Sequence, residues 1–180
     1  MSNYNLKLTL DGHEQLRLRS INRQDIEDLR TWKNDNKNSF FLHDDITPEQ
    51  QQKWFLVFST RENDHMFIVE QRSEGEWKKI GCMGFRRLED EGCVDAYNII
   101  RSLKIEPASF TMSDAFRTML AYANSIYPDL PLQVKVLANN PAVAWYKMNE
   151  FAELKKKDNY VLMQLNLDSV KNLKWSKQNS

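Results

Sequence analysis

The sequence has no excess of charge, few cysteines and no long hydrophobic run. Its 25 basic and 25 acidic residues give a formal net charge of zero, which argues against a dedicated nucleic-acid-binding protein, because such proteins carry a basic excess. Cys82 and Cys93 have no metal-ligand spacing, and no secretory hydrophobic segment precedes them. We therefore expect reduced thiols, a cytoplasmic protein and no metal site. No apolar run approaches the roughly 20 residues that cross a bilayer, so no membrane partner is expected.

The length and composition fit one globular domain. The chain has 180 residues, of which 41% are hydrophobic, and this is enough to fill a core at this size. Five Trp, six Tyr and nine Phe make disorder improbable away from the ends. We expect a single domain over residues 1–167. A polar tail, residues 168–180, should fray unless Trp175 anchors it.

Hydrophobic periodicity predicts an alternation of strands and helices. Strands are predicted at residues 5–10 and 15–20, followed by one helix capped by Asn22 and a second capped by Thr47 before Pro48. The later predicted elements are strands at 66–70, 79–85 and 93–101, a helix at 113–127, a strand at 132–137, a short helix at 141–148, and strands at 151–154 and 160–167. This order predicts an α/β (α+β) fold with helices on both faces of a mixed sheet.

Several segments resemble, in order and spacing, one branch of the GNAT acyltransferases, which includes ribosomal-protein N-terminal and sugar-amine N-acetyltransferases. The resemblance covers roughly residues 15–165 and implies a GNAT-like, mostly antiparallel central sheet. It also implies a split between two central parallel strands, here at 94–101 and 132–137. The segments that carry it are Leu16-Arg17-Leu18-Arg19 with Asp25 and Trp32-Lys33-Asn34-Asp35, Ile46-Thr47-Pro48-Glu49 with Trp54-Phe55, Ile80-Gly81 with Gly84-Phe85, and Asn139 to Phe151.

The resemblance implies transfer of an acetyl group from acetyl-CoA to a primary amine by direct attack. The acceptor would be a small molecule, an amino-sugar or a protein N-terminus, and a homodimer is possible. The main chain of Ile99, Ile100 and Arg101 would pair with the pantetheine arm, and Asn139 would contact CoA. Asn139 is also a good residue for starting the helix that follows.

Tyr146 matches the family tyrosine near the CoA sulfur. A phenol with a pKa of about 10 stays protonated at neutral pH and can serve as the general acid; the alternative is a tyrosine packed in the core. The base is less determined. Asp95, which shares a strand face with Tyr97, and His43, whose imidazole suits proton acceptance near pH 7, are candidates, and Glu70 is a weaker one. Each could equally be a solvated residue, with water taking the proton.

Four aromatic residues are candidates for the wall of the acceptor pocket, although aromatic stripes more often belong to a core. They are Phe40, Phe41, Trp54 and Tyr97.

The pyrophosphate loop departs from the family pattern Arg/Gln-x-x-Gly-x-Gly/Ala. Pro107 replaces the first residue, and Phe110 and Met112 occupy the glycine positions. Glycine lets a backbone approach phosphate closely, so we expect a weakened hold on CoA. Two alternatives to an enzyme follow: a GNAT-fold ligand-binding or scaffolding protein without tight CoA binding, and an interaction subunit of a larger assembly. Compensating hydroxyls would come from Ser109, Thr111 and Ser113.

Overall fold

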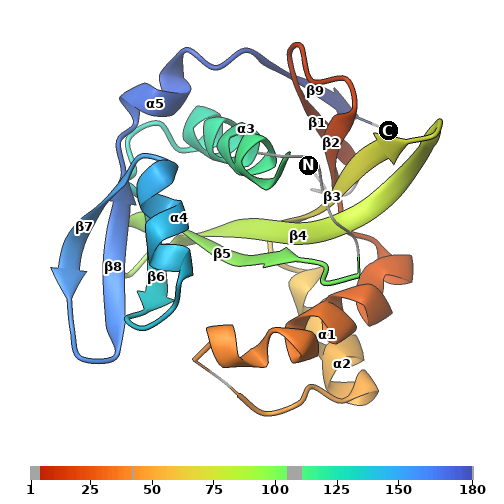
Figure 1. Cartoon of the computed structure of the whole chain (residues 1–180), viewed down its shortest axis with the longest axis horizontal. Coiled ribbons are helices and arrows are strands. Elements are labelled where there is room, and N and C mark those ends of the chain that lie inside the picture. The colour runs from red at the N-terminus through yellow and green to blue at the C-terminus, as the bar shows by residue number, and fades with distance from the viewer. Residues whose placement is uncertain (1–4, 42, 105–110, 180) are drawn as a thin grey trace.

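The computed structural model describes residues 5–41, 43–104 and 111–179, and its strands form one nine-stranded sheet (Figure 1). The order across the sheet is β7-β8-β6-β5-β4-β3-β2-β1-β9. All the pairings are antiparallel except that of β5 with β6, which confirms the predicted mixed, mostly antiparallel sheet. The strands are β1 (Leu6–Leu10), β2 (Leu16–Ser20), β3 (Asp64–Ser73), β4 (Glu76–Leu88), β5 (Cys93–Arg101), β6 (Leu132–Leu137), β7 (Phe151–Lys156), β8 (Tyr160–Leu165) and β9 (Trp175–Asn179).

The helices begin where capping chemistry placed them. The side chain of Asn22 accepts from the backbone of Gln24, and Asp25 completes a capping box. Thr47 and Gln50 form a second capping box before Pro48. None of the described helices is long and apolar enough to span a membrane. The helical segments are η1 (Arg23–Asp25), α1 (Ile26–Asp35), η2 (Lys37–Ser39), α2 (Pro48–Phe58), α3 (Thr111–Ile126), α4 (Ala142–Met148) and α5 (Asp168–Lys171).

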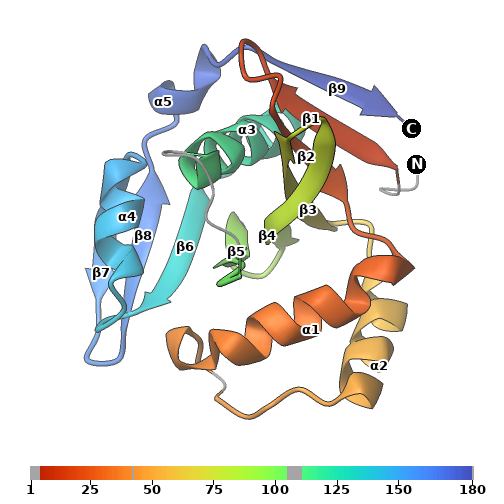
Figure 2. The same cartoon turned by 45° about the vertical axis from the view of Figure 1, so that its right-hand side comes forward.

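The sheet is covered on both faces, as predicted (Figures 1 and 2). Helix α3 packs on one face, where fully buried Phe67, Phe85 and Phe116 belong to the larger hydrophobic core. Helices α1 and α2 pack on the opposite face over a smaller core that includes Trp32 and Phe58. We refer to these as the α3 face and the α1 face. This division matters because the two faces hold different parts of the candidate site.

The C-terminal segment is ordered, which corrects the expectation that it frays. Residues 168–171 form α5, and β9 pairs with β1 along its whole length, from Leu10 opposite Trp175 to Leu6 opposite Asn179. The ring of Trp175 lies 5.7 Å from that of Tyr122 on α3. Trp175 therefore anchors the tail, which was the exception that the sequence allowed.

Strands β5 and β6 separate soon after they begin. Their parallel pairing comprises Val94 with Leu132 and Asp95 with Gln133. Beyond that point β5 continues to Arg101 and β6 to Leu137, and the two strands diverge (Figure 2). The split predicted between the two central parallel strands is confirmed.

Candidate functional site

A β-bulge interrupts β5 just beyond the start of the split. Cys82 pairs with Ile100 and Gly84 pairs with Tyr97, so Asn98 and Ile99 together oppose the single residue Met83. Asn98 has φ 50, a left-handed conformation that Asn tolerates better than most side chains. The bulge changes the alternation of the strand, so that the side chains of Asn98 and Ile100 both serve the α1 face.

A pocket of about 440 Å³ lies on the α1 face, between α1, α2 and the sheet. It is large enough for a small molecule. Asn98 and Ile100 form part of its wall, so the pocket reaches β5 beyond the last residue that pairs with β6. The lining residues are Leu29, Lys33, Lys37, Asp44, Asp45, Ile46, Gln50, Gln51, Trp54, Met66, Cys82, Asn98 and Ile100.

Lys33 of α1 points its ammonium at the bulge. Its Nζ donates to Asn98 Oδ1 at 2.6 Å and lies 3.2 Å from the centroid of the Phe40 ring. Burial lowers the pKa of Lys33 to about 8, because a low-dielectric surrounding disfavours the charged form. Nearby Cys82 donates to the carbonyl of Asn98 at 3.5 Å, and burial raises the pKa of its thiol to about 12. The wall of the pocket thus contains a lysine whose pKa is lowered, next to a thiol that stays protonated.

Charges of both signs surround the mouth of the pocket. Lys37 forms an ion pair with Asp45 at 2.9 Å, and Asp44 lies beside them. His43, a candidate base from the sequence, is exposed, and its Nδ1 lies 3.2 Å from the carbonyl oxygen of Lys37. It is not among the residues that line the pocket.

Asp95, the other candidate base, sits where β5 and β6 last pair. Its carboxylate accepts from Arg86, with Oδ2 at 2.9 Å from Nη2 and 3.1 Å from Nε. Burial raises the pKa of Asp95, and Arg86 offsets only part of that effect. Arg86 also lies over the ring of Tyr97, whose hydroxyl donates to Asp64. As expected from the period of two, Asp95 and Tyr97 share a face of the strand.

Tyr146 of α4 is buried on the opposite, α3 face, with 8% of its surface exposed. Its ring packs in T-shaped contact with Phe116 at 5.9 Å and Phe151 at 5.7 Å. Burial raises the pKa of the phenol, and the charge of Asp95 raises it further. The ring of Tyr146 therefore packs against the core of the α3 face, and its hydroxyl keeps its proton at physiological pH.

The four predicted wall aromatics separate into different settings. Trp54 lines the pocket and stacks on Phe58, with centroids 5.1 Å apart. Phe40 packs on the core of the α1 face, next to Lys33. Phe41 is 44% exposed, and Lys135 lies 5.6 Å from its ring. Tyr97 is held by Asp64 and Arg86 as described above. Of the four residues, Trp54 therefore lines the pocket and Phe40 contacts its lysine, Lys33.

The residues expected to hold CoA lie around the split and the start of α3. Ile99 packs toward the α3 face, Ile100 lines the pocket, and Arg101 ends β5. Asn139 is exposed in the turn after β6, and its neighbour Asn140 performs the helix-start role, accepting from the backbone of Ala142 at 2.9 Å.

The start of α3 is described from Thr111 onward. Thr111 is buried, and Ser113 Oγ accepts from Asn149 Nδ2 at 3.3 Å. Met112, at a family glycine position, packs against the core of the α3 face. Pro107, Ser109 and Phe110 lie outside the described residues.

A network of ion pairs lies further along the α1 face, and Lys79 extends it to Asp28 at 2.7 Å. Glu70, the weaker candidate base, accepts from Arg17 at 2.6 Å and from Arg19 at 2.8 Å. Arg19 also pairs with Asp25 at 2.7 Å, and Lys79 lies 2.7 Å from the same carboxylate. Burial opposes ionisation of Asp25, but hydrogen bonds from Arg19 and Lys79 outweigh it and lower the pKa. We call Glu70, Arg17, Arg19, Asp25 and Lys79 the Glu70 cluster; its carboxylates are fully engaged.

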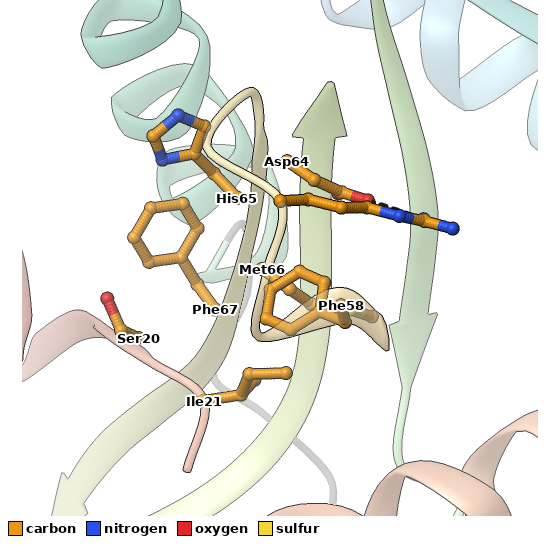
Figure 3. A pocket seen from close by; sticks show the side chains of 8 residues that line it. Ser20, Ile21, Phe58, Asp64, His65, Met66 and Phe67 are labelled. Carbon is orange, nitrogen blue, oxygen red and sulfur yellow. Dashed lines mark hydrogen bonds and ion pairs between the residues drawn. The ribbon is translucent and has the colours of Figure 1, made fainter. Parts of the chain in front are cut away.

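A second, much smaller cavity of about 10 Å³ lies beside β3 (Figure 3). Asp64 and His65 project to opposite sides of the strand there, and His65 stacks on Phe85 with centroids 4.5 Å apart. Burial lowers the pKa of His65 to about 4, and nearby Lys177 adds to the effect. A cavity of this size has room for about one water molecule and is too small for a substrate. Among the described residues, no three His, Cys, Asp or Glu side chains group as metal ligands.

Lys33 stands in one of the segments that resemble the GNAT family, but no role was predicted for it. Asn98 was not predicted as a site residue. The signal for Lys33 was its place one residue after the buried Trp32, in the stretch that leads into the pocket. No pattern signalled the bulge at Asn98.

The family model described as the acetyltransferase (GNAT) domain matches residues 15–144. The chain belongs to the GNAT acetyltransferase family. No curated protein sequence matches it significantly.

Several solved structures have the same fold as this protein over most of its length. An apo nucleotide-linked sugar GNAT, FdhC, has a TM-score of 0.73 and 15% identity, covering 94% of this chain and 93% of that one. Spermidine N-acetyltransferase from Vibrio cholerae, in complex with CoA and spermine, has a TM-score of 0.68 and 17% identity, covering 88% and 99%. A domain from Methanocaldococcus jannaschii has a TM-score of 0.70 and 16% identity, covering 83% and 97%. At these identities the likeness shows the fold.

Proposed function

We propose that this protein transfers the acetyl group of acetyl-CoA to a primary amine bound in the 440 Å³ pocket on the α1 face. Family membership supports acyl transfer, and one structural observation carries the assignment of the site. Asn98 and Ile100 line the pocket and also lie on β5 beyond its last pair with β6. A group entering the split from the α3 face would therefore meet an amine bound on the α1 face.

Acetyl-CoA supplies the acetyl group as a thioester. In this proposal the main chain of Ile99, Ile100 and Arg101, which lies beyond the last pairing of β5 with β6, binds the pantetheine arm, and Asn139 contacts CoA. The phosphates would lie at the N-terminus of α3, near Thr111 and Ser113, since a helix of 16 residues presents its positive dipole end there.

Tyr146 is the proposed general acid. Burial raises the pKa of its phenol, so the hydroxyl keeps its proton and can deliver it from Oη to the leaving sulfur. Asp95, close enough to raise that pKa further, would keep the phenol protonated rather than activate it as a base.

The acceptor is proposed to be a small-molecule amine. The pocket volume suits a small molecule, and two structural neighbours are named as a spermidine N-acetyltransferase and as a nucleotide-linked sugar GNAT. Trp54 offers an aromatic wall, and the pocket's two lysines and two aspartates balance in charge. A balanced lining favours an acceptor with a single amine over a polycation. A cytoplasmic location and a homodimer stay predictions.

A non-catalytic ligand-binding or scaffolding protein is the second candidate. The observation that favours it is Met112, which occupies a family glycine position and packs into the core, so the phosphate-binding backbone has lost its freedom to approach closely.

The test is calorimetry of acetyl-CoA on the full chain, followed by thiol release with four amines: 2-phenylethylamine, glucosamine, spermidine and a short peptide with a free N-terminus. We expect binding and turnover of at least one amine. Tyr146→Phe should lower kcat about 100-fold while leaving acetyl-CoA affinity within about twofold. No heat at millimolar acetyl-CoA together with no thiol release would reject the proposal in favour of the second candidate.

A further inference from the structure

Lys33, which is half-buried on the α1 face, differs from the charged residues of the Glu70 cluster. In the Glu70 cluster, each cation has a carboxylate within 3 Å. For Lys33, no carboxylate of the described residues lies within 4.0 Å of Nζ. Its partners are the amide oxygen of Asn98 at 2.6 Å and the ring of Phe40. An amide oxygen and a ring hold an ammonium in place without neutralising it, and they tolerate the neutral amine as well.

Lys33 lies where a base would have to lie to take a proton from an amine bound in the pocket. Its side chain lines the pocket, and Asn98, which holds it, forms the bulge of β5 beyond the last pair with β6. A substrate amine that is bound in the pocket and faces the split would lie next to Nζ of Lys33. Asp95 is bound by Arg86, and His43 lies outside the pocket lining.

We propose that Nζ of Lys33, positioned by Asn98, accepts the proton that the substrate ammonium must lose before it can be acetylated. This inference rests on the proposed function. The neutral lysine takes one proton from the substrate and becomes an ammonium. The freed lone pair of the substrate nitrogen forms the C–N bond as the C–S bond breaks. The leaving sulfur receives a proton from Tyr146, which regains one from the second N–H of the substrate nitrogen.

The charges around Lys33 suit this role. Burial lowers the pKa of Lys33 to about 8, so a useful fraction is neutral near physiological pH, and a base works best with a pKa near the working pH. The other titratable groups of the pocket are Lys37, Asp44 and Asp45 from the loop after α1, and Cys82 from β4. Cys82 stays a neutral thiol. Helix α2 presents the uncharged Gln50 and Gln51, and β3 presents Met66.

The experiment compares pH–rate profiles of kcat/KM for the wild type, Lys33→Arg and Lys33→Met, using acetyl-CoA and whichever of the four amines above the wild type acetylates fastest. Arginine keeps the charge but cannot lose its proton. We expect both variants to lose about 100-fold in kcat/KM and to lose the ionisation near pH 8 that the wild type shows. Lys53→Met, which removes an exposed lysine of α2, is the matched control and should behave as the wild type.

Three results would overturn the inference. If Lys33→Arg keeps the wild-type rate and pH profile while Lys33→Met does not, the role of Lys33 is to supply a positive charge, for example to bind an anionic group of the substrate. If Asp95→Asn removes the ionisation and the Lys33 variants keep it, Asp95 is the base. If the wild type turns over none of the amines and binds no acetyl-CoA, the proposed function itself fails, a result distinct from the other two.

Discussion

Two groups of charged residues that are buried or half-buried on the α1 face are built in opposite ways. The Glu70 cluster joins three cations and two carboxylates in hydrogen-bonded ion pairs and has no opening to the pocket. Lys33 carries its charge alone, against an amide oxygen and a ring, at the wall of a 440 Å³ pocket. Paired charges of this kind fix how elements meet, here η1 against β2 and β4. A perturbed, unpaired charge in a pocket is more typical of a functional residue.

The largest expected effect comes from breaking the Glu70 cluster. Glu70→Ala leaves Arg17 without a carboxylate and Arg19 with one fewer, both in a largely buried setting. Removing one partner of a buried ion pair typically costs about 3–5 kcal/mol, so urea denaturation should show a loss of that size in the free energy of unfolding.

The exposed pair at the pocket mouth serves as its control. Lys37→Ala removes one exposed ion pair, that with Asp45, and should change the free energy of unfolding by less than about 1 kcal/mol. If Glu70→Ala lowers the free energy of unfolding by as little as Lys37→Ala, the ion pairs of the Glu70 cluster do not stabilise the fold as proposed.

A buried titratable group on the α3 face extends the comparison. His65 has no carboxylate partner in the described residues and stacks on Phe85, and burial lowers its pKa to about 4. Unfolded histidine binds a proton near pH 6.5, whereas the folded state resists protonation until about pH 4, so stability falls as pH falls through this window. The loss attributable to His65 reaches about 3 kcal/mol by pH 4.

The measurement is the free energy of unfolding of the wild type and His65→Phe at pH 7 and pH 4.5. The variant should keep the stacked contact and show less acid destabilisation than the wild type. His43→Gln, which changes an exposed histidine, should follow the wild type. Equal acid sensitivity in all three proteins would mean that His65 charges readily in the folded state.

A smaller effect than those of Glu70 and His65 is predicted for Lys33→Met, and it has the opposite sign. Because the pKa of Lys33 is lowered to about 8, the folded state is penalised as pH falls below the pKa of the unfolded lysine, and fully so below pH 8. After allowing for partial exposure and the lost bond to Asn98, we expect a gain of about 1–2 kcal/mol at pH 7.

That gain should shrink as pH rises from 8 and vanish well above pH 10.5, the ordinary lysine pKa, because only there is the lysine neutral in both states. Lys79→Met, which removes a cation paired with Asp25, should instead destabilise the protein. Destabilisation by Lys33→Met at pH 7 would mean that Lys33 is a structural residue, and the contrast between the two groups would be lost.

Most of the fold could be predicted because its determinants are local. Caps at Asn22 and Thr47 and the apolar stripe of α3 define helices without reference to the rest of the chain. The exception is β9, whose sequence from Trp175 to Asn179 is polar and does not alternate. It becomes a strand by pairing with β1, a partner about 165 residues away, and no local pattern encodes such a partner.

The candidate site was harder to predict because its properties arise from packing. Tyr146 and Asn139 were found through a motif, but the motif gave no information on the face of the sheet that each serves. The pKa of Lys33 depends on α1 lying over the bulge of β5, and Asn98 reaches φ 50 only where two residues oppose Met83. Glu150 offers a parallel, since it has φ 65 in the turn between α4 and β7.

Direct titration of Lys33 by NMR tests the central contrast most closely. The side-chain carbon next to Nζ would be followed in the full chain between pH 6 and 11 and assigned by its absence in Lys33→Arg. A midpoint near pH 8 is predicted, well below that of the paired Lys79, whose pKa is raised. A midpoint at the ordinary lysine value of about 10.4 would contradict the account, since Lys33 would then remain an ammonium throughout the physiological range.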